Sequence, residues 1–277
     1  MDKNRNIIEQ KLNKLRDLLH TYDKAVIAFS GGVDSTFLAA AARSSMSDVL
    51  LVTARSESLP AAEQADCVKI ADSLGLRQVF LEAGEFADAQ FVANTAERCY
   101  FCKKNRFSAL AAWAASQGYS YILDGTNVDD QGDYRPGLKA LAEIDSVKSP
   151  LFEAGFVKGE IRLLSQEWQL PTWDKPSAAC LVSRLTYGLP ITKDKLKQVE
   201  LAEIAIRPFV TGQLRVRHHG SLARIEVEPD QVAHLTEQQT RLTIVQELQR
   251  LGFTYVTIEL GGYRTGSMND QLEKEST

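Results

Sequence analysis

The segment Ser-Gly-Gly-Val-Asp-Ser at residues 30–35 combines residue types that bind phosphate groups. An apolar run at residues 25–29 precedes it and a helical pattern follows, which predicts a turn between a strand and a helix. The paired glycines permit backbone conformations that other residues avoid, so successive amides can surround an anion at the helix N-terminus. The serines add hydroxyl donors, and the aspartate makes chemical sense if Mg²⁺ lies between it and a phosphate. The candidate phosphate-binding residues are Ser30, Gly31, Gly32, Asp34 and Ser35.

The turn lacks the lysine that a Walker loop places after its last glycine to reach the terminal phosphates. Residues 30–35 instead resemble the PP-loop of ATP pyrophosphatases, which hold the β,γ-diphosphate of ATP as a leaving group while AMP passes to a substrate oxygen. The resemblance implies that ATP is a cosubstrate, that Asp34 binds Mg²⁺, and that a substrate is adenylated. A simple Gly-Gly turn is the alternative.

The composition is that of a globular protein, with 277 residues, 44% hydrophobic and 25% charged. A net charge of −4 and a pI near 5.7 argue against a large nucleic-acid-binding surface. No apolar run reaches the roughly 20 residues that span a bilayer, and the charged N-terminus is not a signal peptide. Four cysteines are too few for a disulfide framework. We therefore expect a cytoplasmic protein without membrane or nucleic-acid partners.

Short apolar segments alternate with helical patterns from residue 25 to about residue 182. This order predicts an α/β fold, a doubly wound parallel sheet with its ligand at the carboxyl ends of the strands. The expected strands are residues 25–29, 49–53, 78–81 and 121–124, and the expected helices are residues 35–42, 61–74 and 98–117.

After Pro190 the pattern changes to that of a smaller α+β domain. The expected elements are strands at residues 214–218, 223–227 and 254–260 and a helix at residues 230–250. We place a nucleotide-binding domain at residues 1–187 and a domain for substrate binding or oligomerisation at residues 188–277, and we expect a homo-oligomer.

A second glycine-containing turn, Asp-Gly-Thr-Asn-Val-Asp-Asp at residues 124–130, follows an expected strand and should face the same cleft. It resembles the Gly-Thr-Asn-x-Asp-Asp segment that closes over the adenylate in PP-loop enzymes. The resemblance assigns ATP binding to Gly125, Thr126, Asn127 and Asp130. A solvated acidic turn is the alternative for the two final aspartates. Arg135 and Lys139, at an i, i+4 spacing, are suited to hold a phosphate or to pair with neighbouring acids.

Cys99 and Cys102 have an i, i+3 spacing at the start of an expected helix and are flanked by basic residues. Both the helix end and the cations favour thiolates, which bind metals. Cys180 lies in a long loop expected beside the nucleotide cleft, whereas Cys67 has helical spacing with apolar residues and is assigned to the core.

Three interpretations compete for the three remaining cysteines. A zinc site needs a fourth ligand, and the four histidines have no finger-like spacing. A thioredoxin-like pair explains the Cys-x-x-Cys but leaves ATP without a purpose. A cluster held by three thiolates, with one iron open to carry sulfide, uses all three cysteines and suits adenylation chemistry, so we prefer it.

Nearly the whole chain resembles the LarE family. The specific similarity lies in residues 124–130, 133–140, 176–184, 214–217 and 261–269. Members are ATP-dependent sulfur transferases that convert the carboxylates of a pyridinium mononucleotide dicarboxylate into thiocarboxylates, for the nickel-pincer cofactor of lactate racemase. The resemblance implies this small-molecule substrate and this activity.

Two chemistries are attributed to the family. In one, a loop cysteine attacks the adenylated carboxylate, loses its sulfur and becomes dehydroalanine. In the other, three cysteines hold a four-iron, four-sulfur cluster that delivers an added sulfide. The pair Cys99 and Cys102 fits the cluster form, with Cys180 as the third ligand, and the sacrificial pattern places its cysteine where Ala179 stands. A sacrificial role for Cys180 remains the alternative.

Arg215 and Arg217 are two residues apart on an expected strand, so they share a face and can clamp the substrate phosphate. A solvated strand edge is the alternative. Ser183 and Arg184 are candidates to orient the substrate or stabilise charge near Cys180. Weaker candidates, each more often a surface charge, are Glu200, Glu203 and Glu226.

Rival functions make different demands on the chain. A tRNA thiolase needs an RNA-binding module or a basic face, which the acidic pI does not favour. An amidotransferase-type synthase needs an ammonia source, and nothing in the sequence resembles a glutaminase. A nucleotide sensor would keep its activity without Cys99, Cys102 and Cys180.

Overall fold

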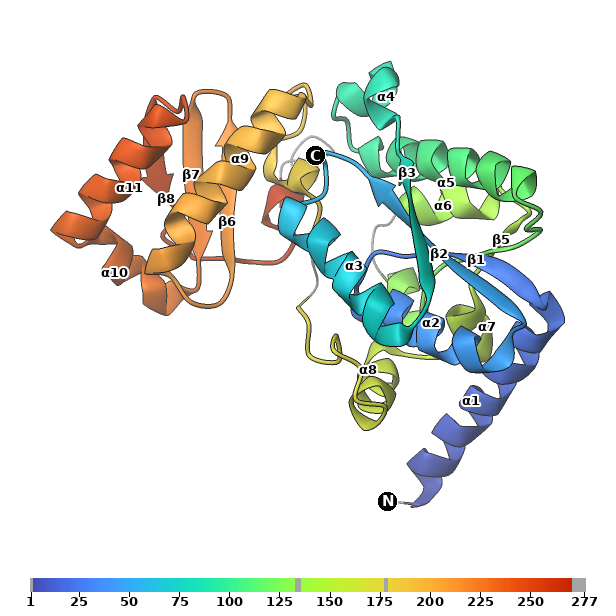
Figure 1. Cartoon of the computed structure of the whole chain (residues 1–277). Coiled ribbons are helices and arrows are strands. Elements are labelled where there is room, and N and C mark those ends of the chain that lie inside the picture. Colours follow the sequence, from blue (N-terminus) through green and yellow to red (C-terminus); the bar gives the residue numbers. More distant parts are fainter. Residues whose placement is uncertain (1, 133–135, 177–178, 271–277) are drawn as a thin grey trace. The chain divides into compact units, whose positions relative to one another are not determined.

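A computed structural model describes residues 2–132, 136–176 and 179–270 (Figure 1). The chain forms two compact units, each described here by itself. The first comprises Met1–Ser56, Ala61–Glu85 and Cys99–Ala178, and the second comprises Glu57–Pro60, Phe86–Arg98 and Ala179–Thr277. No helix among the described residues is long and apolar enough to cross a membrane.

A parallel sheet of five strands in the order β3-β2-β1-β4-β5 forms the centre of the first unit. Its strands are β1 (Lys24–Ala28), β2 (Asp48–Arg55), β3 (Arg77–Glu82), β4 (Ile122–Leu123) and β5 (Val147–Lys148). Ala25, Val26 and Ile27 of β1 are all fully buried, as expected for a strand covered on both faces. The predicted α/β parallel sheet is confirmed.

Helices cover both faces of this sheet (Figure 1). They are α1 (Asp2–Tyr22), α2 (Val33–Ser45), α3 (Ala61–Leu74), α5 (Arg98–Ser116), α6 (Pro136–Ala142), α7 (Pro150–Ala154) and α8 (Lys158–Glu167). Ile27 packs in a cluster with Leu15, Phe37 and Phe156, on the face of α1 and α2. Val26 points the other way, into a cluster with Leu110 of α5. Successive side chains of β1 therefore pack into two hydrophobic clusters, one on each face of the sheet.

The chain order reverses at β1, whose neighbours are β2 on one side and β4 on the other. Such a switch point leaves a crevice at the carboxyl ends of the two strands, where α/β proteins bind ligands. Residues 30–35 follow β1 and residues 124–130 follow β4, so the fold brings both predicted segments to this crevice.

The second unit contains a smaller sheet in the order β6-β7-β8, with β6 (Leu214–His219) antiparallel to β7 (Leu222–Val227) and β8 (Tyr255–Ile258) parallel to it. Its helices are α4 (Ala89–Val92), α9 (Lys193–Ile206), α10 (Val232–Thr236) and α11 (Gln238–Arg250). Leu214, Val216 and Ile225 are buried in a core shared with α9, α10 and α11.

The second unit departs from the sequence prediction in one of its helices. The expected helix 230–250 is two helices, because Glu237 adopts an extended backbone between them. Leu235 of the first helix and Thr240 of the second are both buried.

The compact units also differ from the expected domains 1–187 and 188–277. Residues 179–187 and two segments from the N-terminal half belong to the second unit. The segment Phe86–Arg98 is held by Asn94, whose side-chain amide donates to the carbonyls of Thr186 and Leu189, each at 2.8 Å. The segment Glu57–Pro60 is held by the backbone amide of Leu181, which donates to the Ser58 carbonyl at 2.8 Å.

His218 makes the stability of the second unit depend on pH. Its side chain is 3% exposed, and its Nε2 donates to Gln198 Oε1 at 2.9 Å. Burial, together with the positive charge of Lys195, lowers the pKa of His218 to about 4. Because the unfolded imidazole titrates near 6.5, protonation favours unfolding below that value. The free energy of unfolding should fall as the pH falls from 6.5 towards about 4.

Urea unfolding at pH 7 and pH 4.5, with the hydrogen exchange of β6 as the probe of the second unit, measures this loss of stability. We expect His218→Gln to lose less stability than the wild type between the two values, by roughly 2–3 kcal/mol. Equal losses in both proteins would show that other groups carry the acid sensitivity.

Candidate active site

The turn at residues 30–35 has the geometry of an anion-binding loop. Gly31 has φ +64°, a conformation that a side chain would strain. Gly32 caps α2 without a side-chain hydrogen bond, which leaves amides at the helix N-terminus for a ligand. The hydroxyls of Ser30 and Ser35 are 3.2 Å apart, and Ser35 Oγ also donates to the Gly32 carbonyl at 3.2 Å.

The segment after β4 packs directly on this turn. A Cβ atom added to Gly125 would lie 3.1 Å from the Ser35 amide nitrogen and 3.2 Å from Asp34 Cβ. Asp124 is 4% exposed and accepts hydrogen bonds from Thr126 Oγ1 and Ser149 Oγ, both at 2.5 Å. The structure thus brings together the two segments that the sequence predicted to share a cleft.

Hydrogen bonds within residues 124–130 shape the second segment. Asn127 N donates to Asp130 Oδ2, and Asp129 N donates to Asn127 Oδ1, both at 3.0 Å. Asp129 also accepts from the backbone amide of Lys158 at 2.8 Å. The two aspartates therefore hold the segment and the start of α8 in place, which a freely solvated acidic turn would not do.

Asp34, the predicted magnesium ligand, is half-buried and has both oxygens engaged. Asn127 Nδ2 donates to Oδ1 at 3.3 Å, and Lys158 Nζ donates to Oδ2. A carboxylate at the start of α2, beside exposed amides, has the oxygen chemistry that Mg²⁺ requires. Lys158 was not predicted from the sequence, because it lies 124 positions after Asp34 and no motif contains it.

A second lysine, Lys175, also reaches the turn. Its Nζ donates to the Gly31 carbonyl at 3.3 Å and pairs with Glu63 at 2.8 Å and Asp66 at 3.8 Å. Lys175 directly precedes residues 176–184, the segment that contains Cys180, but its type and spacing alone did not indicate this contact.

Cys67 lies under the turn in the core, as predicted. It is 2% exposed, and a Cβ atom added to Gly31 would lie 2.9 Å from its Sγ. Burial raises the pKa of the Cys67 thiol to about 11, although nearby Lys175 opposes the shift. Such a thiol is protonated and inert at neutral pH.

Cys99 and Cys102 lie in the first turn of α5, one exposed and the other half-buried. Arg98 begins this helix, donates to Asn94 Oδ1 at 2.7 Å and stacks on the Tyr187 ring, with 4.2 Å from Cζ to the ring centroid. Cys99 and Cys102 belong to the first unit and Cys180 to the second. In the part of the chain that the structure describes, no three His, Cys, Asp or Glu side chains are grouped to hold a metal ion.

Ser183 and Arg184 contact the backbone of Cys180. The carbonyl of Cys180 accepts from Ser183 Oγ at 2.8 Å and from Arg184 Nη1 at 3.1 Å. Arg184 also forms a bidentate pair with Glu203, at 2.9 and 3.1 Å. These bonds fix the loop that carries the thiol, so the two side chains act on its conformation.

Arg217 is 5% exposed and pairs with Glu226, which is fully buried. Glu226 also accepts from Arg224 at 2.9 Å and from Ser267 Oγ at 3.0 Å. The expectation that Glu226 is a surface charge is wrong, because β7 turns this side chain towards the cationic face of the sheet.

Arg215 is half-buried, and its guanidinium carbon lies 5.3 Å from the centroid of the Tyr263 ring. Burial lowers the pKa of Arg215, and the charge of Arg184 lowers it further. In the described chain no carboxylate forms an ion pair with Arg215. The unpaired charge favours an anion at this position.

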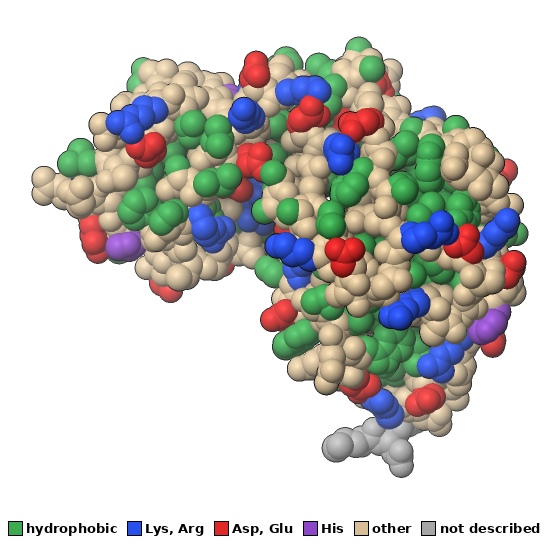
Figure 2. All heavy atoms as spheres, in the orientation of Figure 1, with side chains coloured by type: hydrophobic (Ala, Val, Ile, Leu, Met, Phe, Trp, Pro, Cys, Tyr) green, Lys and Arg blue, Asp and Glu red, His purple; other side chains and the backbone are tan. Residues whose placement is uncertain are grey.

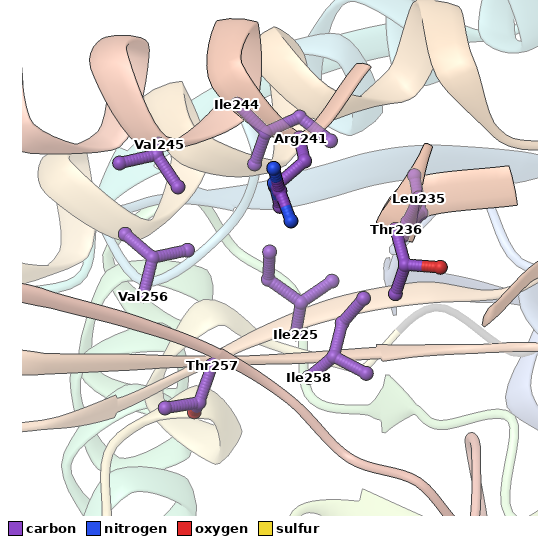
Figure 3. A pocket seen from close by; sticks show the side chains of 9 residues that line it. All are labelled: Ile225, Leu235, Thr236, Arg241, Ile244, Val245, Val256, Thr257 and Ile258. Atoms are coloured by element: carbon purple, nitrogen blue, oxygen red, sulfur yellow. The ribbon is translucent and has the colours of Figure 1, made fainter. Parts of the chain in front are cut away.

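Other parts of the chain do not join these groups. Arg135 lies outside the described residues, and Lys139 is exposed on α6. The second unit has a cavity of about 160 Å³ between α11 and the strands β7 and β8 (Figure 3). Its lining is mainly aliphatic and includes Ile225, Ile244 and Val256. It contains none of the predicted site residues.

The chain reversal at β1 and the Ser-Gly-Gly-x-Asp-Ser turn define an α/β protein of the PP-loop class. No protein-family model matches the chain. The chain is 41% identical, over 97% of its length and 100% of the relative, to an uncharacterized protein of Synechocystis sp.. It is 37% identical, over 94% of its length and 92% of the relative, to the pyridinium-3,5-bisthiocarboxylic acid mononucleotide synthase of Lactiplantibacillus plantarum. A GMP synthase of Aeropyrum pernix is 30% identical over 67% of the chain and 40% of that protein.

The chain therefore belongs to the family of the pyridinium-3,5-bisthiocarboxylic acid mononucleotide synthase, the LarE family. This confirms the resemblance drawn from the sequence motifs.

Proposed function

We propose that this protein is an ATP-dependent sulfur transferase that forms AMP and pyrophosphate. Its substrate is a pyridinium-3,5-dicarboxylate mononucleotide, whose carboxylates become thiocarboxylates for the nickel-pincer cofactor of lactate racemase. The observation that carries the proposal is the packing of residues 124–130 against Asp34 and Ser35 at the switch point. Membership of the LarE family supports the choice of substrate.

Adenylation overcomes the resistance of an ionised carboxylate to nucleophiles. The amides at the start of α2 and the hydroxyls of Ser30 and Ser35 would hold the diphosphate. Asp34 would hold Mg²⁺, which neutralises charge on the leaving pyrophosphate. Residues 125–127 would cover the nucleotide from the second segment. A soft sulfur nucleophile then displaces AMP from the activated acid.

Charge in the second unit supports a site for the substrate phosphate. Four arginines, at positions 184, 215, 217 and 224, lie near the buried or half-buried carboxylates of Glu203 and Glu226. Arg215 has the charge least compensated among them, as described above. We propose that Arg215 and Arg217 bind the phosphate, with Arg217 held in position by Glu226.

For sulfur delivery we propose a four-iron, four-sulfur cluster on Cys99, Cys102 and Cys180. Cys99 and Cys102 have an i, i+3 spacing on α5, which supports binding of both thiols to the same cluster. Among the described residues, Cys99 and Cys102 lie on α5 in the first unit, and Cys180 belongs to the second. A bound cluster would supply the sulfide that attacks the acyl adenylate. Cys180 as a sacrificial donor is the alternative.

The distribution of charge supports a small substrate over RNA. On the face shown in Figure 2, basic and acidic side chains are interspersed, without a continuous basic surface. A tRNA thiolase is expected to present such a surface.

Product analysis tests the proposal. The wild type should convert ATP to AMP and pyrophosphate only when the mononucleotide dicarboxylate is present, measured by anion-exchange chromatography. Asp34→Asn should lose this reaction by about 10²-fold or more, because the Mg²⁺ ligand is gone. ADP as the product would contradict adenylation.

A further inference from the structure

The PP-loop turn of this chain contains no lysine, yet a lysine ammonium binds its acidic residue. We infer that Lys158 is a phosphate-binding residue. When Asp34 binds Mg²⁺, the ammonium group of Lys158 moves from Asp34 to the β,γ-phosphates of ATP. The inference rests on the proposed function and adds a residue to its nucleotide site.

The position of Lys158 is fixed by a rigid element. It is the first residue of α8, whose Ile161 and Leu164 are buried in the same core as Phe37 of α2. Its backbone amide donates to Asp129 at 2.8 Å, so the second nucleotide segment also holds it. The ammonium therefore stays within reach of the phosphate-binding turn when its side-chain torsions change.

The ion pair with Asp34 is poorly placed to be a structural bond. The side chains of Lys158 and Asp34 are 34% and 23% exposed, and pairs this open to water contribute little stability. The helix is already fixed by Lys11, whose Nζ contacts both oxygens of Glu160 at 2.8 Å. Those side chains are less exposed, at 23% and 18%. Lys158 is thus available for another partner.

The balance of charge explains why Lys158 exchanges Asp34 for the phosphates when the nucleotide binds. Asp34 and Lys158 neutralise each other when no nucleotide is bound, so the carboxylate of Asp34 has a counter-charge. The ammonium of Lys158 competes with a cation for Oδ2 of Asp34, because the two positive charges repel each other. After the exchange, the released ammonium lies beside the most negative part of the ligand, where it stabilises the developing pyrophosphate.

The test measures the binding of ATP, AMP and inorganic pyrophosphate with Mg²⁺ to the full-length protein by calorimetry. Lys158→Met should weaken ATP and pyrophosphate about tenfold to hundredfold, the range for a charged hydrogen bond, and leave AMP within about twofold. Lys158→Arg should recover part of the loss. Lys11→Met removes a lysine from the other ion pair of α8 and should bind all three ligands like the wild type.

Two results would overturn the inference. Unchanged pyrophosphate binding in Lys158→Met would show that the ammonium stays on Asp34. Equal losses for ATP and AMP would show that Lys158 only holds the loop. A wild type that binds neither ATP nor pyrophosphate would instead defeat the proposed function, so the two failures are distinguishable. Circular dichroism of each variant verifies that it folds.

Discussion

Cys180→Ser is expected to release pyrophosphate from ATP and to hold the AMP as acyl adenylate, but to lose sulfur transfer by roughly 10³-fold or more. The residues proposed for adenylation all lie in the first unit, whereas Cys180 lies in the second. Removing its sulfur should therefore leave the first half of the reaction intact. A serine hydroxyl is a hard and mostly protonated group, and it can neither bind iron as a thiolate does nor supply sulfur. Detection of the thiocarboxylate by mass spectrometry, with pyrophosphate measured in parallel, checks both halves of the reaction.

The matched control is Cys67→Ala, which removes the buried cysteine of α3. It should cost stability through lost packing and still deliver sulfur. Thiocarboxylate formation by Cys180→Ser at the wild-type rate would exclude Cys180 from sulfur transfer.

Cys99→Ser separates the two mechanisms in which Cys180 takes part. If three thiolates hold a cluster, this variant should lose iron and acid-labile sulfide after anaerobic purification, together with sulfur transfer. If Cys180 is the sacrificial donor, Cys99→Ser should retain one transfer, and the intact mass should fall by one H₂S at Cys180. Each outcome assigns a mechanism.

Glu226→Gln should destabilise the second unit by about 3–5 kcal/mol. Glu226 is fully buried and accepts from Arg217 at 2.9 and 2.6 Å, from Arg224 and from Ser267. A neutral amide leaves the buried guanidinium of Arg217 without its counter-charge, which costs more than the lost hydrogen bonds. Because the chain forms two units, the hydrogen exchange of β6 and β7 is a better measure than one global transition.

Glu259→Gln is the matched control for this variant. Glu259 pairs with the same Arg224, at 3.6 Å, but its side chain is 38% exposed. We expect its replacement to change stability by no more than about 1 kcal/mol. A Glu226→Gln protein as stable as this control would show that the buried pair adds nothing to the fold.

Several features could be predicted because their causes are local. Phosphate-binding chemistry at residues 30–35 follows from paired glycines between an apolar strand and a helix, and the structure has this order. The burial of Cys67 follows from its helical spacing with Ile70 and Leu74. The alternation of strands and helices determined the parallel sheet, because parallel strands need helical crossovers. The short strand β5 was missed, since two residues carry no periodic signal.

The partners of the charged residues were decided by the tertiary structure alone. Lys158 and Asp34 are distant in sequence, and their contact exists because α8 packs against α2. Glu226 differs from a surface glutamate only through the two arginines that β6 and β7 place around it. The sequence by itself therefore determined the class of fold, the phosphate-binding turn and the chemical types of the candidate site. Which charges meet depended on packing between distant elements, because the pairing energy of an ion depends on burial and distance, and neither is encoded in local spacing.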